Sequence, residues 1–563
     1  MVNPESEWMR KPHDISSYEV QELETSQTIC TSCANPLWIV QHRERALQTL
    51  KKKLWVVSKD KTCVTEECPE MHKLLRPEAQ EGALPLLPRS EYGVDVVVGL
   101  GEMRMTNGKT LKESHRTLVD QYGVEISERH VSNLYRVFLG LVHCVNADFL
   151  PLRELLKQQG RIVVSVDGVQ FDGVSPVLYV VRDVLSSEVL YAERVEKRDA
   201  AHLEALLLKV KALGIPVTGV VSDKEKGLVP AIEQAFPGVP HQYCQSHYLG
   251  NLRKPMDEDL AQLGSGVSKV VYAVRGFARK VAEVEERQAA SSAELPTYKN
   301  LEVTIEEMKL VKELCSAALA GGKTSGDPIL GPAPVRRFER LDRVKHVAEE
   351  AAKKTGGKWN LLGALISVLT LLTAHTELAE RLHRQAGIVR HVAHILNFKS
   401  TGQQIRRMLR TYLNSLAREP SEGQAEYSAF VQHVIAVSNR YWKGLFHCYD
   451  NEDIPRTDNA LEQMFSQFKR HERKITGRKT TSGGPLESFA AFVIESWSTV
   501  RLRPQYAELV HLVSPEKLLE ARAELEKLAG PARKRRSIQR DPERHLKRVL
   551  DKWFDPSKYP DYD

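Results

Sequence analysis

Apolar and polar positions follow different periodicities along the 563 residues of this chain. Between residues 161 and 243, the β-branched runs "RIVVSVDGVQ", "PVLYVVRDVL" and "EVLYAERVEK" come in quick succession, and "IPVTGVVSD" and "VPHQYC" come later. Such runs predict five strands, the first three joined by tight turns. Helical runs at 199–213 and 227–236 separate the later strands. We therefore expect a mixed sheet with helices on its faces.

Residues 255–450 show long helical periodicities and no strand signal of similar strength. We predict an all-α domain inserted into the α/β unit. Several domains are expected, because the chain is much longer than the size at which a single core stops growing. The longest apolar stretch, 361–374, is too short to span a bilayer, and the first residues lack the apolar core of a signal peptide. These features favour a soluble, cytoplasmic protein with no membrane partner.

Two close cysteine pairs lie near the N-terminus, Cys30 with Cys33 and Cys63 with Cys68, separated by strand-like segments. Short-range thiolate pairs are typical of a structural zinc ribbon, in which each pair forms one knuckle of a tetrahedral site. The second pair is more widely spaced than usual, so His72 could replace one of its members. The sequence predicts one structural Zn²⁺, with four ordinary free thiols as the alternative.

A pair of helices is predicted in "TLKESHRTLVDQYGVEISERHVSNLYRVFLG", with a break at Tyr122 and Gly123 and a cap at Ser127. This is the spacing of a helix-turn-helix. The second helix would then present its polar side chains to a DNA groove, and the candidate DNA-binding residues are Arg129, His130, Asn133 and Arg136. A plain helical hairpin within a core is the alternative.

Two acidic residues end strands that otherwise read as buried. Asp167 follows the first β-branched run and Asp223 follows the fourth. Burying an ionised carboxylate is costly unless its charge is compensated, and a bound metal ion supplies that compensation. The two aspartates are therefore candidate metal ligands.

The segment "RTDNALEQMFSQFKRHERKITGRK", residues 456–479, predicts an amphipathic helix that becomes densely basic from Lys469 onward. Glu462 lies in its first turn. With Asn459 as the N-cap, Glu462 would complete a capping box, and this structural role does not exclude a role at an adjacent sheet edge. Basic side chains that could contact DNA follow it: Lys469, Arg470, Arg473 and Lys474. An ordinary solvated helix face is the alternative for these charges.

The overall charge balance is mildly basic, with 80 Lys and Arg against 73 Asp and Glu and a formal net charge of +7. This excess indicates an anionic partner only where the charges cluster. The tail "PARKRRSIQR" at 531–540 is one such cluster. By itself it is weak evidence, since basic runs are often only solubilising.

Asp167, Asp223, the "CQSH" motif with Cys244 and His247, the long helical stretch and "TDNALEQMFSQFKR" occur in an order that resembles the DDE transposases of bacterial insertion sequences. The layout is similar to the Mutator-like branch, in which a helical insertion falls between the second Asp and the Glu. The resemblance covers roughly residues 161–479 and implies an RNase H-like core, in which the first and fourth strands lie side by side.

The resemblance also implies a catalytic site. Asp167, Asp223 and Glu462 would hold two Mg²⁺ or Mn²⁺ ions, which activate a water or a 3′-hydroxyl and stabilise the leaving oxygen of phosphoryl transfer on DNA. Asp172, Asp183 and Asp458 are the substitutes if the register differs. Cys244 and His247 would pack near this site. Completion of a zinc site there by His447 and Cys448 is disfavoured, because sequence neighbours rarely ligate one ion well.

The sequence thus predicts a multidomain α+β and α/β protein with an N-terminal zinc ribbon, a helix-turn-helix, and an RNase H-like mixed sheet with a large all-α insertion. We expect the protein to be a DNA transposase that binds the ends of an insertion sequence. It would act in the cytoplasm, in association with the bacterial nucleoid, and as a homo-oligomer on double-stranded DNA. A catalytically silent, transposase-derived DNA-binding protein and an RNase H-type structure-selective nuclease are the alternatives. The predicted boundaries are 1–75, zinc ribbon; 76–90, linker; 91–150, helix-turn-helix; 160–255 and 451–505, the catalytic core; 256–450, the insertion; and 506–563, a basic helical tail.

Overall fold

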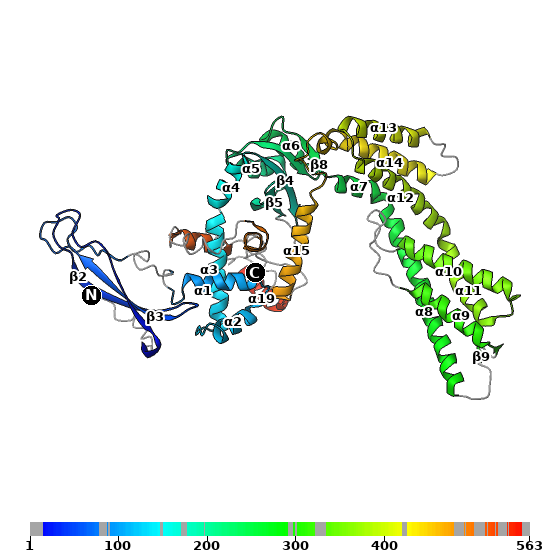
Figure 1. Cartoon of the computed structure of the whole chain (residues 1–563), viewed down its shortest axis with the longest axis horizontal. Helices are drawn as coiled ribbons and strands as arrows, with labels where there is room; N and C mark the ends of the chain where they lie inside the picture. The colour runs from blue at the N-terminus through cyan, green and yellow to red at the C-terminus, as the bar shows by residue number, and fades with distance from the viewer. Residues whose placement is uncertain are drawn as a thin grey trace, which may run out of the picture. The chain divides into compact units, whose positions relative to one another are not determined.

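The computed structural model describes residues 15–77, 87, 90–146, 150–170, 177–195, 197–290, 297–298, 301–320, 334–418, 425–477, 489, 491–499, 513–514, 516–523, 525–526, 538 and 540–553. It contains two compact units, residues 1–239 with 458–563 (unit 1) and residues 240–457 (unit 2). The protein is a mixed α and β structure with two mixed sheets and many helices, which Figure 1 shows along the chain.

Unit 1 begins with a three-stranded sheet. Its strands are β1 (Glu19–Glu24), β2 (Trp38–Gln48) and β3 (Lys53–Thr62), in the order β1-β3-β2, preceded by the short η1 (Ile15–Ser17). β1 is parallel to β3 and β2 is antiparallel to it. The small core of this sheet consists of Leu23, Leu47, Leu54 and Val56. Four apolar side chains form only a modest core, so this sheet depends on further support.

Four helices follow: α1 (Val94–Met105), α2 (Leu111–Asp120), α3 (Glu128–Asn146) and α4 (Leu150–Gln159). α2 begins with a capping box, since the Thr110 side chain accepts from the Glu113 backbone N–H and the Glu113 side chain accepts from the Thr110 N–H. α1 packs on α3. Gly101 permits the close approach, because a Cβ there would lie 2.1 Å from the ring of Phe138.

The second mixed sheet contains β4 (Ile162–Val169), β5 (Val177–Asp183), β6 (Val189–Val195), β7 (Val217–Ser222) and β8 (His241–Tyr243). The strand order is β6-β5-β4-β7-β8. β4 is antiparallel to β5 and parallel to β7, and β5 is antiparallel to β6. The prediction of five strands, the first three joined as hairpins, is confirmed. α5 (Ala200–Lys211) and α6 (Leu228–Ala235) separate the later strands as expected.

Side chains on the two faces of the second sheet belong to different cores. Val164, Val166 and Tyr179 pack with apolar residues of α5 and α6. Val169 and Val180 pack instead with α1, α3 and α15 (Asn459–Thr476). The sheet is therefore covered on both faces, which explains why its strands read as continuous apolar runs.

Unit 2 is mostly helical. Its described elements after β8 are α7 (Gln245–Arg253), η3 (Lys254–Met256), α8 (Asp257–Ala290), β9 (Thr297–Tyr298), β10 (Leu301–Glu302), α9 (Ile305–Leu319), α10 (Pro334–Lys354), α11 (Asn360–Leu369), η4 (Thr370–His375), α12 (Thr376–Asn397), α13 (Gly402–Arg418), α14 (Ala425–Tyr441), η5 (Trp442–Gly444) and η6 (His447–Tyr449). Unit 1 also contains η7 (Val493–Trp497) and α19 (Pro542–Trp553).

One stretch of the described chain, Asn360–Asn397, is long and apolar enough to pass a length-and-composition test for a membrane span. It is divided into α11, η4 and α12. α11 buries Leu361, Leu362, Leu365 and Leu369 and packs on α8, α9 and α10. These contacts are those of a core helix in a bundle.

The predicted helical insertion, 256–450, lies within unit 2, and the finer domain boundaries stay predictions. Most of the predicted linker at 76–90 and most of the basic run at 531–540 lie outside the described residues, as does Asp172.

We expect Gly101→Ala to lower the stability of unit 1 by about 1–3 kcal/mol, because the new methyl group would overlap the Phe138 ring. Gly363→Ala is the matched control, since no atom lies within 4 Å of the added Cβ and Ala is the better helix former. Thermal unfolding followed by circular dichroism measures both variants. An unchanged midpoint for Gly101→Ala would contradict the packing described for α1 and α3.

Candidate functional site

Asp167 and Asp223 come from neighbouring strands of the second sheet. The parallel register pairs Val166 of β4 with Ser222 of β7. Asp167 is the next residue of β4, and Asp223 is the first residue after β7. Adjacent strands lie about 4.8 Å apart, so the two carboxylates emerge side by side at the carboxyl ends of β4 and β7. Both residues are partly exposed. Their charges therefore remain accessible to solvent or to a ligand.

The two aspartates also lie on the same face of the sheet. Side chains alternate along a strand, so Asp167 faces away from Val164 and Val166. Its cross-strand partner is Val180, which packs in the same core as Leu461, Met464 and other residues of α15. α15 itself contacts β4. The helix that carries Glu462 therefore covers the face on which Asp167 lies.

Glu462 is an exposed residue in the first turn of α15. The N-cap of this helix is Asp458, which makes no side-chain capping bond, and Asn459 is already helical. The capping-box role for Glu462 was therefore wrong in register: Asn459 is not the N-cap. Leu461 and Phe465, which lie on the same side of Glu462 in the helical projection, are buried. Glu462 thus lies at the edge of the buried stripe, and Lys469, seven residues later, lies on the same flank.

The three predicted acidic ligands are not gathered around one point. Among the described residues, Asp167, Asp223 and Glu462 do not form a group whose ligand atoms all lie within 4.8 Å of one another. The substitute Asp183 is fully buried, and its carboxylate accepts hydrogen bonds from Val163 N, Gln159 Nε2 and the Ser186 N–H and hydroxyl. This pattern gives Asp183 a structural role. The catalytic assignment of Asp167, Asp223 and Glu462 stays a prediction.

A polar chain that the sequence analysis did not identify leads to Asp223. The Tyr179 hydroxyl donates to Glu225 Oε2 at 2.6 Å, and the Glu225 N–H donates to Asp223 Oδ1 at 3.2 Å. Burial, with the hydrogen bond to Glu225, raises the pKa of Tyr179. Gly168 makes room for this ring, because a Cβ there would lie 2.9 Å from it. In the "DG" pair at the end of β4, Asp167 therefore supplies a carboxylate, and Gly168 leaves the space that the Tyr179 ring occupies.

The four N-terminal cysteines form a compact group. Cys30 Sγ lies 3.7 Å from Cys68 Sγ, and Cys33 Sγ lies 3.5 Å from Cys63 Sγ. The four sulfur atoms all lie within 4.8 Å of one another and could hold a metal ion. His72 is not part of this group and is exposed. The structure therefore selects Cys68 over His72 as the fourth candidate ligand.

The electrostatic surroundings of these thiols are unequal. A hydrogen bond from the backbone of Asn35 is the main reason that the pKa of Cys33 is lowered to about 6. The backbone of Glu70 acts in the same direction on Cys68, but burial and the neighbouring thiols raise the pKa of Cys68 to about 12. The group therefore favours negative charge at Cys33 first.

The predicted DNA-binding residues lie on exposed helix faces. Ser127 accepts a hydrogen bond from the His130 N–H, as the predicted cap requires. Arg129, Asn133 and Arg136 follow at a spacing that places them on one face of α3, and they are exposed, as is His130. On α15, the exposed basic residues are Lys469, Arg470, Arg473 and Lys474. Their assignment to DNA stays a prediction.

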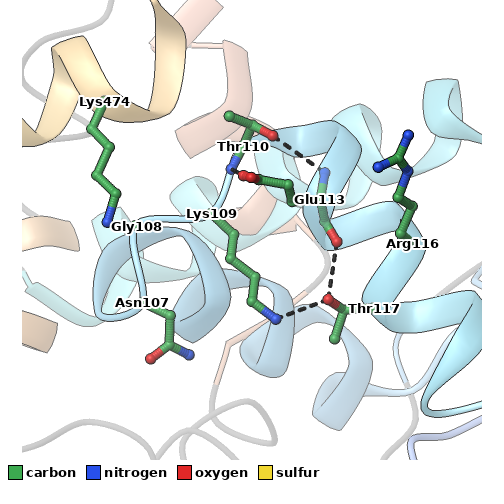
Figure 2. A pocket seen from close by; sticks show the side chains of 8 residues that line it. All are labelled: Asn107, Gly108, Lys109, Thr110, Glu113, Arg116, Thr117 and Lys474. Atoms are coloured by element: carbon green, nitrogen blue, oxygen red, sulfur yellow. Dashed lines mark hydrogen bonds between the residues drawn. The ribbon is translucent and has the colours of Figure 1, made fainter.

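A pocket of about 440 Å³ lies between the turn before α2 and the last turns of α15. Figure 2 shows the basic side chains of Lys109, Arg116 and Lys474 around it, with Glu113 as the acidic one. Glu113 is engaged in the capping box, and Lys109 Nζ donates to Thr117 Oγ1 at 2.8 Å. A Cβ at Gly108 would lie 2.9 Å from Lys474 Nζ. This pocket is suited to a small anionic group.

Positive charge also accumulates behind the pocket. Burial, followed by the charges of Arg104 and Lys474, lowers the pKa of His471 to about 4. The Arg104 guanidinium is buried and donates to the Lys109 carbonyl at 3.2 Å. His471 is therefore neutral near pH 7, and the positive charge of the region resides on the lysines and arginines.

The "CQSH" motif lies at the start of α7. Cys244 is buried, and Gln245 Nε2 donates to the Leu445 carbonyl and to Tyr449 Oη. The Cys448 N–H donates to Gln242 Oε1 at 3.0 Å. Within the described part of the chain, Cys244 and His247 do not form a ligand group with His447 and Cys448. The motif packs β8 and α7 against η6, and the predicted role of Cys244 and His247 near an active site is untested.

Comparisons with known proteins connect this geometry to a class of protein. Residues 115–309 match the family model described as "Transposase, Mutator family". The solved "Drosophila P element transposase strand transfer complex" is similar with 10% identity and a TM-score of 0.30, over 73% of this chain and 94% of that chain. No curated protein matches the chain. The resemblance to transposases is confirmed by the family match, whose range includes Asp167 and Asp223.

Proposed function

We propose that this protein is a DNA transposase that binds the ends of a mobile element and cleaves and joins DNA strands through Asp167, Asp223 and Glu462. One observation carries the proposal: the two aspartates occupy the next register positions at the carboxyl ends of the parallel neighbours β4 and β7. Ligands bind at the carboxyl ends of strands in sheets of this kind. The Mutator-family match over the same strands supports a reaction on DNA.

The sheet topology supports an RNase H-like core. The order β6-β5-β4-β7-β8, with β5 antiparallel to its neighbours, corresponds to three hairpin-connected strands followed by two strands that come after helices. The first and fourth strands are adjacent, as that fold requires. We extend this to the predicted boundaries, with residues 160–255 and 451–505 as the two parts of the catalytic core.

The donor set fits a hard divalent cation. Three carboxylates supply only oxygen ligands, which suit Mg²⁺ or Mn²⁺ rather than Zn²⁺. Such ions, when bound, activate the attacking oxygen and stabilise the leaving oxygen of an in-line phosphoryl transfer. Asp167 and Asp223 would hold them from the sheet, and Glu462 would complete the site from α15. Lys469, on the flank of Glu462, would contact a phosphate of the DNA backbone.

Recognition is assigned to other parts of unit 1. The exposed face of α3 with Arg129 and Arg136 would enter a DNA groove, and the pocket lined by Lys109, Arg116 and Lys474 would hold a backbone phosphate. We place the protein with its DNA substrate in the cytoplasm, in the nucleoid, as a homo-oligomer on paired ends. Each of these assignments depends on the transposase function.

The four cysteines fit a structural zinc. With Zn–S bonds of about 2.3 Å, a tetrahedral site spaces its sulfur atoms by about 3.8 Å, close to the two measured separations of 3.5 and 3.7 Å. The site would join the segment between β1 and β2 to the segment that follows β3, and both lie at the same end of the N-terminal sheet. Its small apolar core of four residues makes such a crosslink necessary for stability.

Asp167→Asn, Asp223→Asn and Glu462→Gln should each abolish Mg²⁺-dependent strand cleavage and transfer, because each removes a negative charge that holds the ions. DNA binding should survive. A cleavage assay on element-end duplexes measures this, with Glu472→Gln on the same helix as the control. Wild-type cleavage in all three variants would instead favour a different set of acids, and absence of cleavage in the wild type would favour the catalytically silent alternative.

The N-terminal module should contain one zinc per chain. Cys63→Ser should release it and unfold the N-terminal sheet while the second sheet remains folded, since metal binding and folding of such a module are coupled. Metal analysis of the purified full chain, together with limited proteolysis, tests this. Stoichiometric zinc retained by Cys63→Ser, or no zinc in the wild type, would contradict it.

Arg129→Ala and Arg136→Ala should weaken binding to element-end DNA. If the arginine reads a guanine, its loss should cost about 1–3 kcal/mol of binding free energy and relax specificity at one base pair. If it contacts a phosphate, its loss should lower the affinity equally on all sequences. Lys157→Ala, an exposed lysine on α4, is the control. Equal end binding by all three variants and the wild type would remove α3 from the interface.

A further inference from the structure

A long segment of unit 2 contains no acidic residue. Residues 381–418 include eight Lys or Arg residues and three His residues but neither Asp nor Glu, although the chain as a whole contains 73 acidic residues among 563. The segment forms most of α12 and all of α13. Solvated protein surfaces normally mix both signs of charge, so an acid-free segment of this length needs another explanation.

The cations at the start of the segment already have partners. Arg381 Nη2 lies 2.9 Å from Asp259 Oδ2, and His383 Nδ1 lies 3.4 Å from Glu339 Oε1. The situation differs on α13. Among the described residues, no ion pair involves Arg406, Arg407 or Arg410. We call these three arginines the α13 basic face.

Aromatic rings hold two of these arginines in place. The Arg410 guanidinium lies 4.7 Å from the ring centre of Trp442, and that of Arg406 lies 5.0 Å from the ring centre of Phe446. Phe446 is fully buried, while Arg407 and Arg410 are exposed. An arginine stacked on a ring keeps its charge and most of its N–H donors while losing conformational freedom. The charges are thus fixed before any partner arrives.

One acid is engaged at the start of α13, about one turn before Arg406. The Asp450 carboxylate accepts from the Gly402 N–H at 2.9 Å, at the first turn of α13, where the helix dipole favours an anion. By contrast, α10 of the same unit carries mixed charges, and His346 lies 3.6 Å from both Asp342 and Glu349. The α13 basic face therefore differs from the ordinary charged surface of its own unit.

We propose that the α13 basic face binds the phosphate backbone of double-stranded DNA. Planar guanidinium groups match phosphate oxygens in two-bond geometry, and three of them within two helical turns span neighbouring phosphates. This contact would not depend on the DNA sequence, because it involves phosphate groups and no base edges. The inference rests on the proposed function, and it adds to α3 and α15 a DNA contact made by unit 2.

The test compares two double variants of the full chain. Arg407→Ala with Arg410→Ala removes two charges from the α13 basic face. Arg275→Ala with Arg279→Ala is the matched control, since both arginines are exposed on α8 and Arg275 lies 5.5 Å from the Tyr272 ring centre. Binding to a long mixed-sequence duplex is measured by fluorescence anisotropy at several NaCl concentrations, without divalent metal.

We expect the α13 variant to bind about tenfold or more weakly, with a slope of log affinity against log salt reduced by about 1.8, which is 0.9 for each lost phosphate contact. The control should stay within about twofold of the wild type, because no phosphate contact is assigned to it. Arg407→Lys with Arg410→Lys retains the charge but not the two-bond geometry, so it should recover the salt slope and part of the affinity. The loss should be the same on duplexes of unrelated sequence.

Equal affinity and equal salt slope for the α13 variant, the control and the wild type would overturn the proposal. A loss in which the lysine variant shows no recovery would also overturn it, because the effect would then arise from packing of Trp442 rather than from charge. Failure of the proposed function is a separate result: the wild type would then bind duplex DNA, and the α13 variant would bind it more weakly, but the wild type would cleave no element-end duplex with Mg²⁺. A wild type that binds no duplex would overturn both proposals.

Discussion

The parallel pairing of β4 with β7 is the constraint on which the candidate site depends. It places Val166 beside Ser222, so that Asp167 and Asp223 follow at the same level of the sheet. A shift of one residue in either strand would turn one carboxylate to the opposite face, where α5 and α6 form an apolar core. The register is therefore protected by the cost of burying a charge there.

Both faces of the sheet help to fix this register. On one side, Val164, Val166 and Tyr179 pack with α5 and α6, and on the other, Val169 and Val180 pack with α15. The same packing positions α15 against β4 through Met464 and Phe468. Glu462 is thus held on a helix that covers the face of Asp167. The proposed mechanism further requires the carboxylate of Glu462 to approach those of Asp167 and Asp223 closely enough to share a metal ion.

Positive charge is distributed over separate elements in this protein. In unit 1 it occurs on the exposed face of α3, around the pocket at α2 and along α15, where the lowered pKa of His471 reflects burial next to Arg104 and Lys474. In unit 2 it occurs on α13, which itself contains no acidic residue. A net charge of only +7 conceals this arrangement, because acids elsewhere in the chain offset it. A DNA-binding chain needs local rather than total charge.

The sequence by itself determined the elements whose cause is local. β-branched runs specified the five strands, and the cysteine pairs specified a four-sulfur group, because each signal is contained in a few adjacent residues. The tertiary structure decided what depends on residues far apart. It chose Cys68 over His72, moved the N-cap of α15 to Asp458, and created both the pocket between α2 and α15 and the hydrogen bond of Tyr179 to Glu225. These features arise from packing and register between distant segments, which no local pattern encodes.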